Sequence, residues 1–347
     1  MFGQFLQAQW QNVIANITNI SLQYGILHDI AQCWIDTDYQ IGQDKYQARP
    51  LGVSIDIHGA VFAVSSLMIL AFVVLTLALP EQATATFDGA KSWINAHATW
   101  FYLLSANVFV LLCLGLIVSP LGRIRIGGAE ATPDFSRISW FSMLFAAGMG
   151  IGLMFYGVAE PLTHYGTSLA GTTLGEDGVR TDWAPLGAAA GDPEAAARLG
   201  MAATLLHWSL HPWAMYAIVA LALALFSYNK GLPMTVRSIF YPILGERIWG
   251  WPGHLIDILA VFAILFGLAT SLGYGAEQAV AGLHYLFGIG DGDVTLVLLI
   301  AGITAVAVGS IVAGVDKGVK RLSEINMLLA FMLLMFVVFV GPTLLIL

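Results

Sequence analysis

Long apolar stretches separated by short polar turns fill the chain after about residue 55. Seven of them are long enough to cross a bilayer, since a transmembrane helix needs about 20 apolar residues. They lie near Ile57–Leu79, Thr99–Val118, Ile138–Ala159, Leu199–Tyr228, Ile258–Tyr285, Val294–Val315 and Ile325–Leu347. The pattern predicts an all-α integral membrane protein, with a polar segment over residues 1–50 and a transmembrane domain over 51–347.

Composition supports a membrane protein. Hydrophobic residues make up 58% of the chain and charged residues only 10%, whereas soluble domains are about 25% charged. The net charge of −8 therefore says little about partners beyond membrane lipid, and no basic stripe indicates nucleic acid. Cys33 and Cys113 are too far apart in sequence to indicate a disulfide framework or a metal cluster.

Basic residues are distributed unequally between the two sets of loops. Eleven Lys and Arg residues flank the spans on one side and three on the other. The positive-inside rule places the eleven in the cytoplasm. We therefore expect a cell inner membrane protein with a cytoplasmic N-terminus and an external segment from Pro161 to Gly200.

The two ends of the chain differ from its middle. Residues 1–50 are rich in Gln and Asn and lack the pattern of a signal peptide. We interpret them as an interfacial or partly disordered cytoplasmic segment; a regulatory sensor is the alternative, but no charge cluster supports it. The chain stops at Leu347 without a polar flank, so we expect a truncated seventh span rather than a natural seven-span protein.

Three glycines interrupt the third stretch, at Gly148, Gly150 and Gly152. Each costs a helix about 1 kcal/mol relative to alanine, so local unwinding is easy there. Unwound carbonyls can coordinate a cation, and free N–H groups can receive a carboxylate. The same glycines also form a small-xxx-small face for helix packing.

The fourth stretch is free of charge and rich in aromatic residues. Trp208, Trp213 and Tyr216 surround Pro212, which removes a helical N–H and predicts a kink. A quaternary ammonium has no N–H to donate, so aromatic faces are its natural ligands. The alternative is an aromatic belt or ordinary packing.

Some ionisable residues inside apolar stretches are candidates for function. His207 and His211 have the i, i+4 spacing of metal ligands, but no third ligand lies near them in sequence. We favour hydrogen bonds to neighbouring helices for both. Glu277 is a candidate for ion coupling because charged residues within spans are often functional. The alternative is a solvated position near the external end of a long helix.

The chain resembles the betaine/carnitine/choline transporter family from about residue 55 to 347. The resemblance rests on the segments 148–157, 160–163, 207–216, 266–273 and 325–327, which recur in order. It implies a LeuT-like inverted-repeat fold, of which this chain holds two extra N-terminal helices and the first five-helix repeat. It also implies a homotrimer that carries glycine betaine, choline or carnitine.

The resemblance further implies roles for individual residues. Trp208, Trp213 and Tyr216 would form one side of an aromatic box, and the three glycines would form the unwound segment near the substrate. Backbone carbonyls of Ala146 and Met149 would hold a sodium ion. Ile264 and Leu268 stand where some sodium-coupled members carry hydroxyls, which puts a second sodium site in doubt and leaves proton coupling or exchange open.

Three functions from different classes follow. The first is a secondary transporter of a quaternary ammonium osmolyte, coupled to sodium or protons and without another cofactor. An intramembrane enzyme would need a nucleophile–base pair or a metal triad, and the sequence offers only the two histidines. A ligand-sensing module that does not transport is the third.

Overall fold

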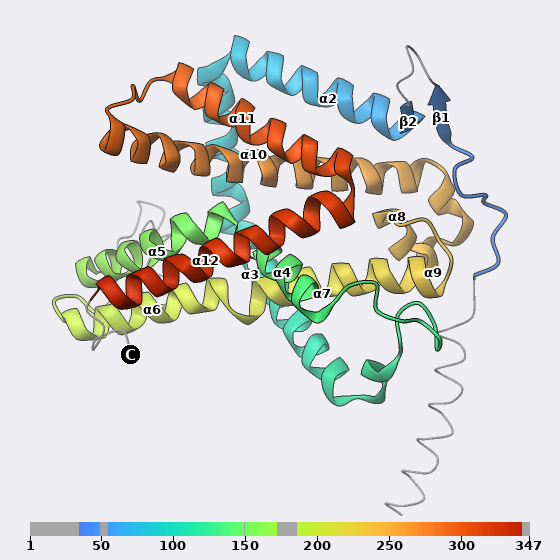
Figure 1. The fold of residues 1–347 in the computed structure, drawn as a ribbon, viewed down its shortest axis with the longest axis horizontal. Coiled ribbons are helices and arrows are strands. Elements are labelled where there is room, and N and C mark those ends of the chain that lie inside the picture. The colour runs from blue at the N-terminus through green and yellow to red at the C-terminus, as the bar shows by residue number, and fades with distance from the viewer. Residues whose placement is uncertain (1–34, 49–54, 149, 172–185, 342–347) are drawn as a thin grey trace, which may run out of the picture. The chain divides into compact units, whose positions relative to one another are not determined.

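The computed structural model describes residues 35–48, 55–148, 150–171 and 186–341 (Figure 1). Helices make up most of this part of the chain, as the apolar pattern predicts. The elements are β1 (Lys45–Ala48), β2 (Ile55–His58), α2 (Gly59–Ala78), α3 (Pro80–Val118), η2 (Pro120–Arg123), α4 (Arg137–Gly148), α5 (Ile151–Ala170), α6 (Pro193–Trp208), α7 (Leu210–Ala224), η3 (Leu225–Asn229), α8 (Val236–Ile239), α9 (Tyr241–Leu244), η4 (Gly245–Trp249), α10 (Trp251–Phe287), α11 (Asp293–Ala313), η5 (Val315–Val319) and α12 (Lys320–Val340).

Six helical segments among the described residues are long and apolar enough to cross a membrane. They are Gly59–Ala78, Pro80–Val118, Pro193–Asn229, Trp251–Phe287, Asp293–Ala313 and Val315–Val340. The protein is therefore an all-α, multi-pass membrane protein, apart from one short hairpin.

The stretch near Ile138–Ala159 is interrupted at the glycines, as the sequence analysis favours. The chain forms α4 and α5 there, with an interruption between Gly148 and Ile151. The seventh stretch forms a helix up to Val340, and residues 342–347 lie outside the described part of the chain.

The chain divides into two compact units. The first comprises Met1–Ala131 with Leu205–Ala263, and the second comprises Thr132–Thr204 with Ile264–Leu347. Each unit is described by itself below.

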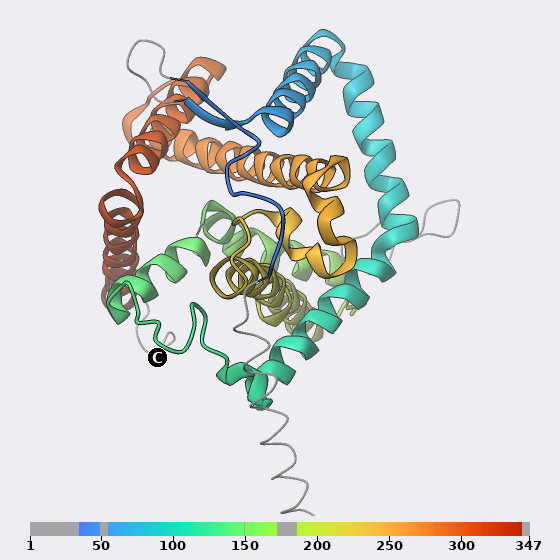
Figure 2. The same ribbon diagram turned by 90° about the vertical axis from the view of Figure 1, so that its right-hand side faces the viewer.

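In the first unit, an antiparallel hairpin of β1 and β2 leads directly into α2 (Figure 2). Pro80 then begins α3, since a proline lacks only an N–H that the first helical turn does not use. Helix α3 packs along α7, where the Cys113 thiol lies 3.9 Å from the carbonyl of Ala214. Helix α7, which carries Trp213 and Tyr216, thus packs against α3, the second span.

The first unit also contains a strap, which we define as residues 35–48. The Ile35 N–H donates to the Lys230 carbonyl at 3.0 Å, and the Thr37 hydroxyl donates to Glu246 at 3.0 Å. The Tyr39 ring stacks on Trp249 with centroids 4.0 Å apart. The interpretation of residues 1–50 as interfacial or partly disordered thus misses an ordered segment that packs on the connection between α7 and α10.

Glu246 also accepts a hydrogen bond from the Tyr241 phenol at 2.6 Å. The hydrogen bond to this carboxylate raises the pKa of Tyr241 above its ordinary value, because it favours the protonated phenol. Burial does the same to the pKa of Tyr39. Both rings therefore hold their protons at neutral pH.

In the second unit, α4 packs along α12 (Figure 1). The Ser139 hydroxyl donates to Glu324 Oε1 at 2.8 Å, and Ser142 Oγ lies 3.5 Å from the sulfur of Met327. Helix α6 approaches α5 at Gly200, where an added Cβ would lie 2.7 Å from the backbone nitrogen of Tyr165. Glycine is needed there because α5 and α6 are in backbone contact.

Candidate functional site

The glycine motif breaks a helix, as its sequence predicts. Helix α4 ends at Gly148 and α5 begins at Ile151, with Gly150 as an extended residue at φ −86° and ψ −178°. Met149 lies outside the described residues. The helix is therefore broken at Gly150, whereas Gly148 ends α4 and Gly152 lies in the first turn of α5. The role of these glycines in binding stays a prediction.

The break brings together helix ends of opposite polarity. The last carbonyls of α4 and the first N–H groups of α5 lack partners within their helices. A helix carries partial negative charge at its C-terminus and partial positive charge at its N-terminus. This arrangement suits a cation at the end of α4 and a carboxylate at the start of α5.

Gly150 itself is not required by strain. Any residue adopts its extended backbone, and an added Cβ would meet no atom within 4 Å. Space beside the break is thus left open in the second unit, which distinguishes Gly150 from the tightly packed Gly200.

The aromatic segment is also interrupted, but before the proline rather than at it. Helix α6 ends at Trp208, Ser209 takes φ −96° and ψ −116°, and α7 begins at Leu210. Pro212 lacks the N–H that would bond to the carbonyl of Trp208 in a continuous helix. Its effect is therefore felt four residues earlier.

Two of the three predicted rings contact each other. Trp213 and Tyr216 have ring centroids 5.9 Å apart with planes tilted by 38°, within the range of aromatic pairs. They are 45% and 68% exposed, so packing within the described residues does not cover them. The ring of Trp208 lies 5.0 Å from that of His207.

A second aromatic group, which the sequence analysis missed, follows the helix break. Phe155 of α5 stacks on Tyr274 of α10 at 5.3 Å, and Tyr156 meets the same ring edge-on at 5.7 Å. Phe155 and Tyr156 directly follow the glycine motif, which was the available signal. Tyr274 is more than a hundred residues away, so no local pattern could pair it with them.

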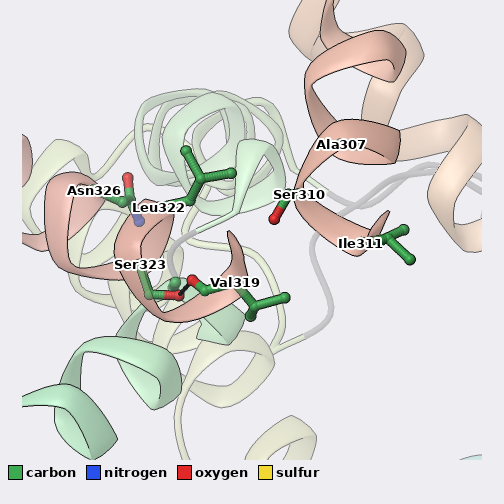
Figure 3. A pocket seen from close by; sticks show the side chains of 8 residues that line it. Ala307, Ser310, Ile311, Val319, Leu322, Ser323 and Asn326 are labelled. Atoms are coloured by element: carbon green, nitrogen blue, oxygen red, sulfur yellow. Dashed lines mark hydrogen bonds between the residues drawn. The ribbon is translucent and has the colours of Figure 1, made fainter. Parts of the chain in front are cut away.

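Ala146, one of the two residues predicted to bind sodium, lines a cavity of about 350 Å³ in the second unit (Figure 3). Ser310, Ser323 and Asn326 add polar groups to its wall. The Ser323 hydroxyl donates to the Val319 carbonyl at 2.8 Å. The cavity has room for roughly ten waters at about 30 Å³ each, so an ion beside Ala146 need not be dry.

The other predicted residues have simpler surroundings. Ile264 and Leu268 are 69% and 54% exposed, and Glu277 is exposed within α10. His211 lies 3.4 Å from Asn107 Oδ1 on α3, which agrees with the expected contact to a neighbouring helix. Among the residues that the structure describes, no three His, Cys, Asp or Glu side chains gather as a metal site would require.

Comparison with known proteins identifies the family. The model of the BCCT, betaine/carnitine/choline family of transporters matches residues 60–347. A glycine betaine/proline/choline transporter of Vibrio parahaemolyticus is 61% identical over 90% of this chain and 56% of its own length. Glycine betaine transporter 1 of the same organism is 50% identical over 88% of this chain and 55% of its own length.

A more distant relative is the glycine betaine transporter OpuD of Bacillus subtilis, which is 43% identical over 77% of this chain and 49% of its own length. The chain thus spans about half the length of the curated relatives that it matches. Family and relatives are transporters and not enzymes, which removes the intramembrane enzyme from consideration. The chain belongs to the betaine/carnitine/choline transporter family.

Proposed function

We propose that this chain serves in secondary transport of a quaternary ammonium osmolyte such as glycine betaine, choline or carnitine. The observation that carries the proposal is the helix break at Gly148–Ile151, where opposite helix ends present carbonyls and N–H groups. The relatives are named as transporters of substrates that include glycine betaine and choline, which supports the proposal.

The uncovered aromatic rings supply the other half of the recognition. In the proposal, Trp208, Trp213 and Tyr216 form one side of a box around the trimethylammonium group. Phe155, Tyr156 and Tyr274 add aromatic surface after the helix break. A carboxylate, where the solute has one, binds the N–H groups at the start of α5, near Gly150 and Gly152.

The test is uptake of labelled glycine betaine into proteoliposomes. The protein is this chain joined to the remaining C-terminal part of the 61% identical relative. Trp213→Leu should weaken apparent affinity at least about tenfold, since one desolvated cation–π contact contributes about 2 kcal/mol. Trp93→Leu, at a ring that is 61% exposed on α3, is the matched control. Unchanged affinity in Trp213→Leu with normal expression would show that Trp213 only packs.

Coupling is part of the same proposal. Carbonyls of Ala146 and Met149 hold one sodium ion, and the apolar Ile264 and Leu268 offer no side-chain oxygen for a second. We therefore expect about one sodium per solute, since hard cations need oxygen ligands. A Hill coefficient near two in a sodium titration contradicts this. Dependence on protons that is lost in Glu277→Gln would assign coupling to Glu277, and dependence on neither gradient would indicate exchange.

The proposal also includes location and assembly. We place the protein in the cell inner membrane with its N-terminus in the cytoplasm, as a homotrimer when the chain is full length. Binding of the solute without any uptake would favour the sensor over the transporter.

A further inference from the structure

A buried ion pair joins α8 to α10 in the first unit. Arg237 is 2% exposed. Its backbone N–H donates to Asp257 Oδ1 at 3.0 Å, and its Nε donates to Oδ2 at 2.6 Å. The charge of Arg237 is thus matched by Asp257, and its Nη2 nitrogen makes a further contact.

That nitrogen reaches His58, which caps α2. His58 Nδ1 accepts the Val61 N–H at 3.3 Å, and Nε2 lies 3.3 Å from the Arg237 guanidinium. Both neighbours are donors, and each needs a lone pair on the ring. A neutral imidazole has one lone pair and one N–H, so either tautomer leaves one donor unmatched.

An acceptor stands on the other side of the same ring nitrogen. Asp44 Oδ2 lies 3.6 Å from His58 Nε2, and it is buried without a hydrogen-bond partner in the described part of the chain. The Asp44 carbonyl accepts the Gly59 N–H at 3.3 Å, which holds this residue beside the start of α2. Tyr39 also interacts with Asp44, and Asp44 Oδ2 gains an N–H donor beside it whenever His58 Nε2 carries a proton.

Other ionisable groups surround this cluster. The His254 ring of α10 meets the His58 ring edge-on at 5.1 Å, and its Nδ1 is also buried without a partner in the described part. Lys45 and Asp56 pair across the hairpin at 3.0 Å. His254 is thus the competing titratable group that a test must separate from His58.

We propose that His58 is a proton-operated latch between the N-terminal hairpin and the connection from α7 to α10. In neutral His58 the single lone pair serves the Val61 N–H in one tautomer and the Arg237 guanidinium in the other, and the second contact ties the hairpin to α8. Protonated His58 carries an N–H at both nitrogens, so it repels both the Val61 N–H and Arg237. It then pairs with Asp44, which lies beside the same hairpin as His58.

The strap has a second attachment. Thr37 and Tyr39 hold it through Glu246 and Trp249, and Tyr39 also interacts with Asp44 and Arg237 of the latch. Acid therefore separates the hairpin and the start of α2 from α8, while the first part of the strap stays bound. The consequence is a pH-dependent link between the first span and the connection from the fourth to the fifth.

The test measures the distance between spin labels on either side of the latch. Labels at Tyr46→Cys and Ile243→Cys use side chains that are 60% and 78% exposed, in a background with Cys33→Ser and Cys113→Ser. The distances are measured at about pH 5 and at about pH 8, because an unperturbed imidazole changes its charge between these values. We expect one narrow distance at the higher pH and at least about a threefold larger long-distance population at the lower.

His58→Asn separates the latch from general acid effects. Its amide oxygen can accept the Val61 N–H, but it does not titrate, so the distance should stay short at both conditions. His97→Asn, at an exposed ring on α3, should keep the full pH response. Asp44→Asn removes the acceptor of the open state, so opening should need a more acidic pH.

Three results overturn the proposal. One is a distance in the parent chain that does not change with pH. Another is a pH response that persists in His58→Asn or disappears in His254→Asn alone, which would assign the sensing to another group. If His58→Asn does not fold, an unchanged opening pH in Asp44→Asn overturns it independently.

Discussion

Removal of the carboxylate of Asp257 should destabilise the protein far more than removal of an exposed one. Asp257 pairs with Arg237 through side chains that are 12% and 3% exposed, with a shortest contact of 2.6 Å. In Asp257→Ala the guanidinium stays buried without its counter-ion. The loss of one partner of a buried pair costs about 3–5 kcal/mol, because the remaining charge is not solvated.

The chain contains a matched control for this substitution. Arg198 and Glu194 form an ion pair at 3.0 Å on α6, with side chains that are 72% and 81% exposed. Water already solvates both groups, so Glu194→Ala should change stability by no more than about 1 kcal/mol. The two substitutions each remove one carboxylate from an Arg pair of similar length and differ mainly in burial.

The assay is thermal unfolding of the purified chain in detergent, followed by loss of the monodisperse peak in size-exclusion chromatography. At about 2–4 °C per kcal/mol for a unit of this size, Asp257→Ala should lower the midpoint by at least about 6 °C. Glu194→Ala should lower it by less than about 4 °C. Equal shifts for the two variants would refute the burial argument. Asp257→Ala combined with Arg237→Leu should recover part of the loss, since no unpaired charge remains.

Three shorter predictions concern glycine packing, topology and a phenol. Gly150→Ala should leave folding intact and reduce uptake in the joined chain. Gly200→Ala should lower thermal stability by about 1–3 kcal/mol, because its Cβ collides with backbone. A loss of stability in Gly150→Ala, or none in Gly200→Ala, contradicts this. A cysteine at the exposed Glu194 should react with an impermeant reagent in intact cells, and one at Ile243 only after lysis; the reverse would invert the proposed orientation. Tyr241 should have a pKa above the ordinary phenol value of about 10, measured as the absorbance difference between the parent chain and Tyr241→Phe. The hydrogen bond from Tyr241 to Glu246 should be lost as pH rises through that raised pKa. A pKa at or below the ordinary value would contradict the pairing.

Much of the fold could be predicted because span length and glycine spacing act locally. The apolar stretches give the helices, and the glycine motif gives the break between α4 and α5. The break at Ser209 was misplaced at Pro212, since a missing N–H acts on the carbonyl four residues earlier.

The strap and the second aromatic group could not be predicted, because their partners are distant in sequence. Tyr39 stacks on Trp249, and Phe155 stacks on Tyr274. The sequence of residues 35–48 has no helical or strand periodicity. Their conformation depends on the residues against which they pack. The sequence also gave no reason to single out Asp257 and His58.

The contacts on either side of the glycine break have a mechanical consequence. Ser139 ties α4 to α12, and the backbone contact at Gly200 ties α5 to α6. The two half-helices are thus fastened to different neighbours, and the extended Gly150 between them carries no side chain to resist rotation. A change in angle at this joint would move α4 with α12 and α5 with α6, and it would also disturb the packing of Phe155 and Tyr156 on Tyr274.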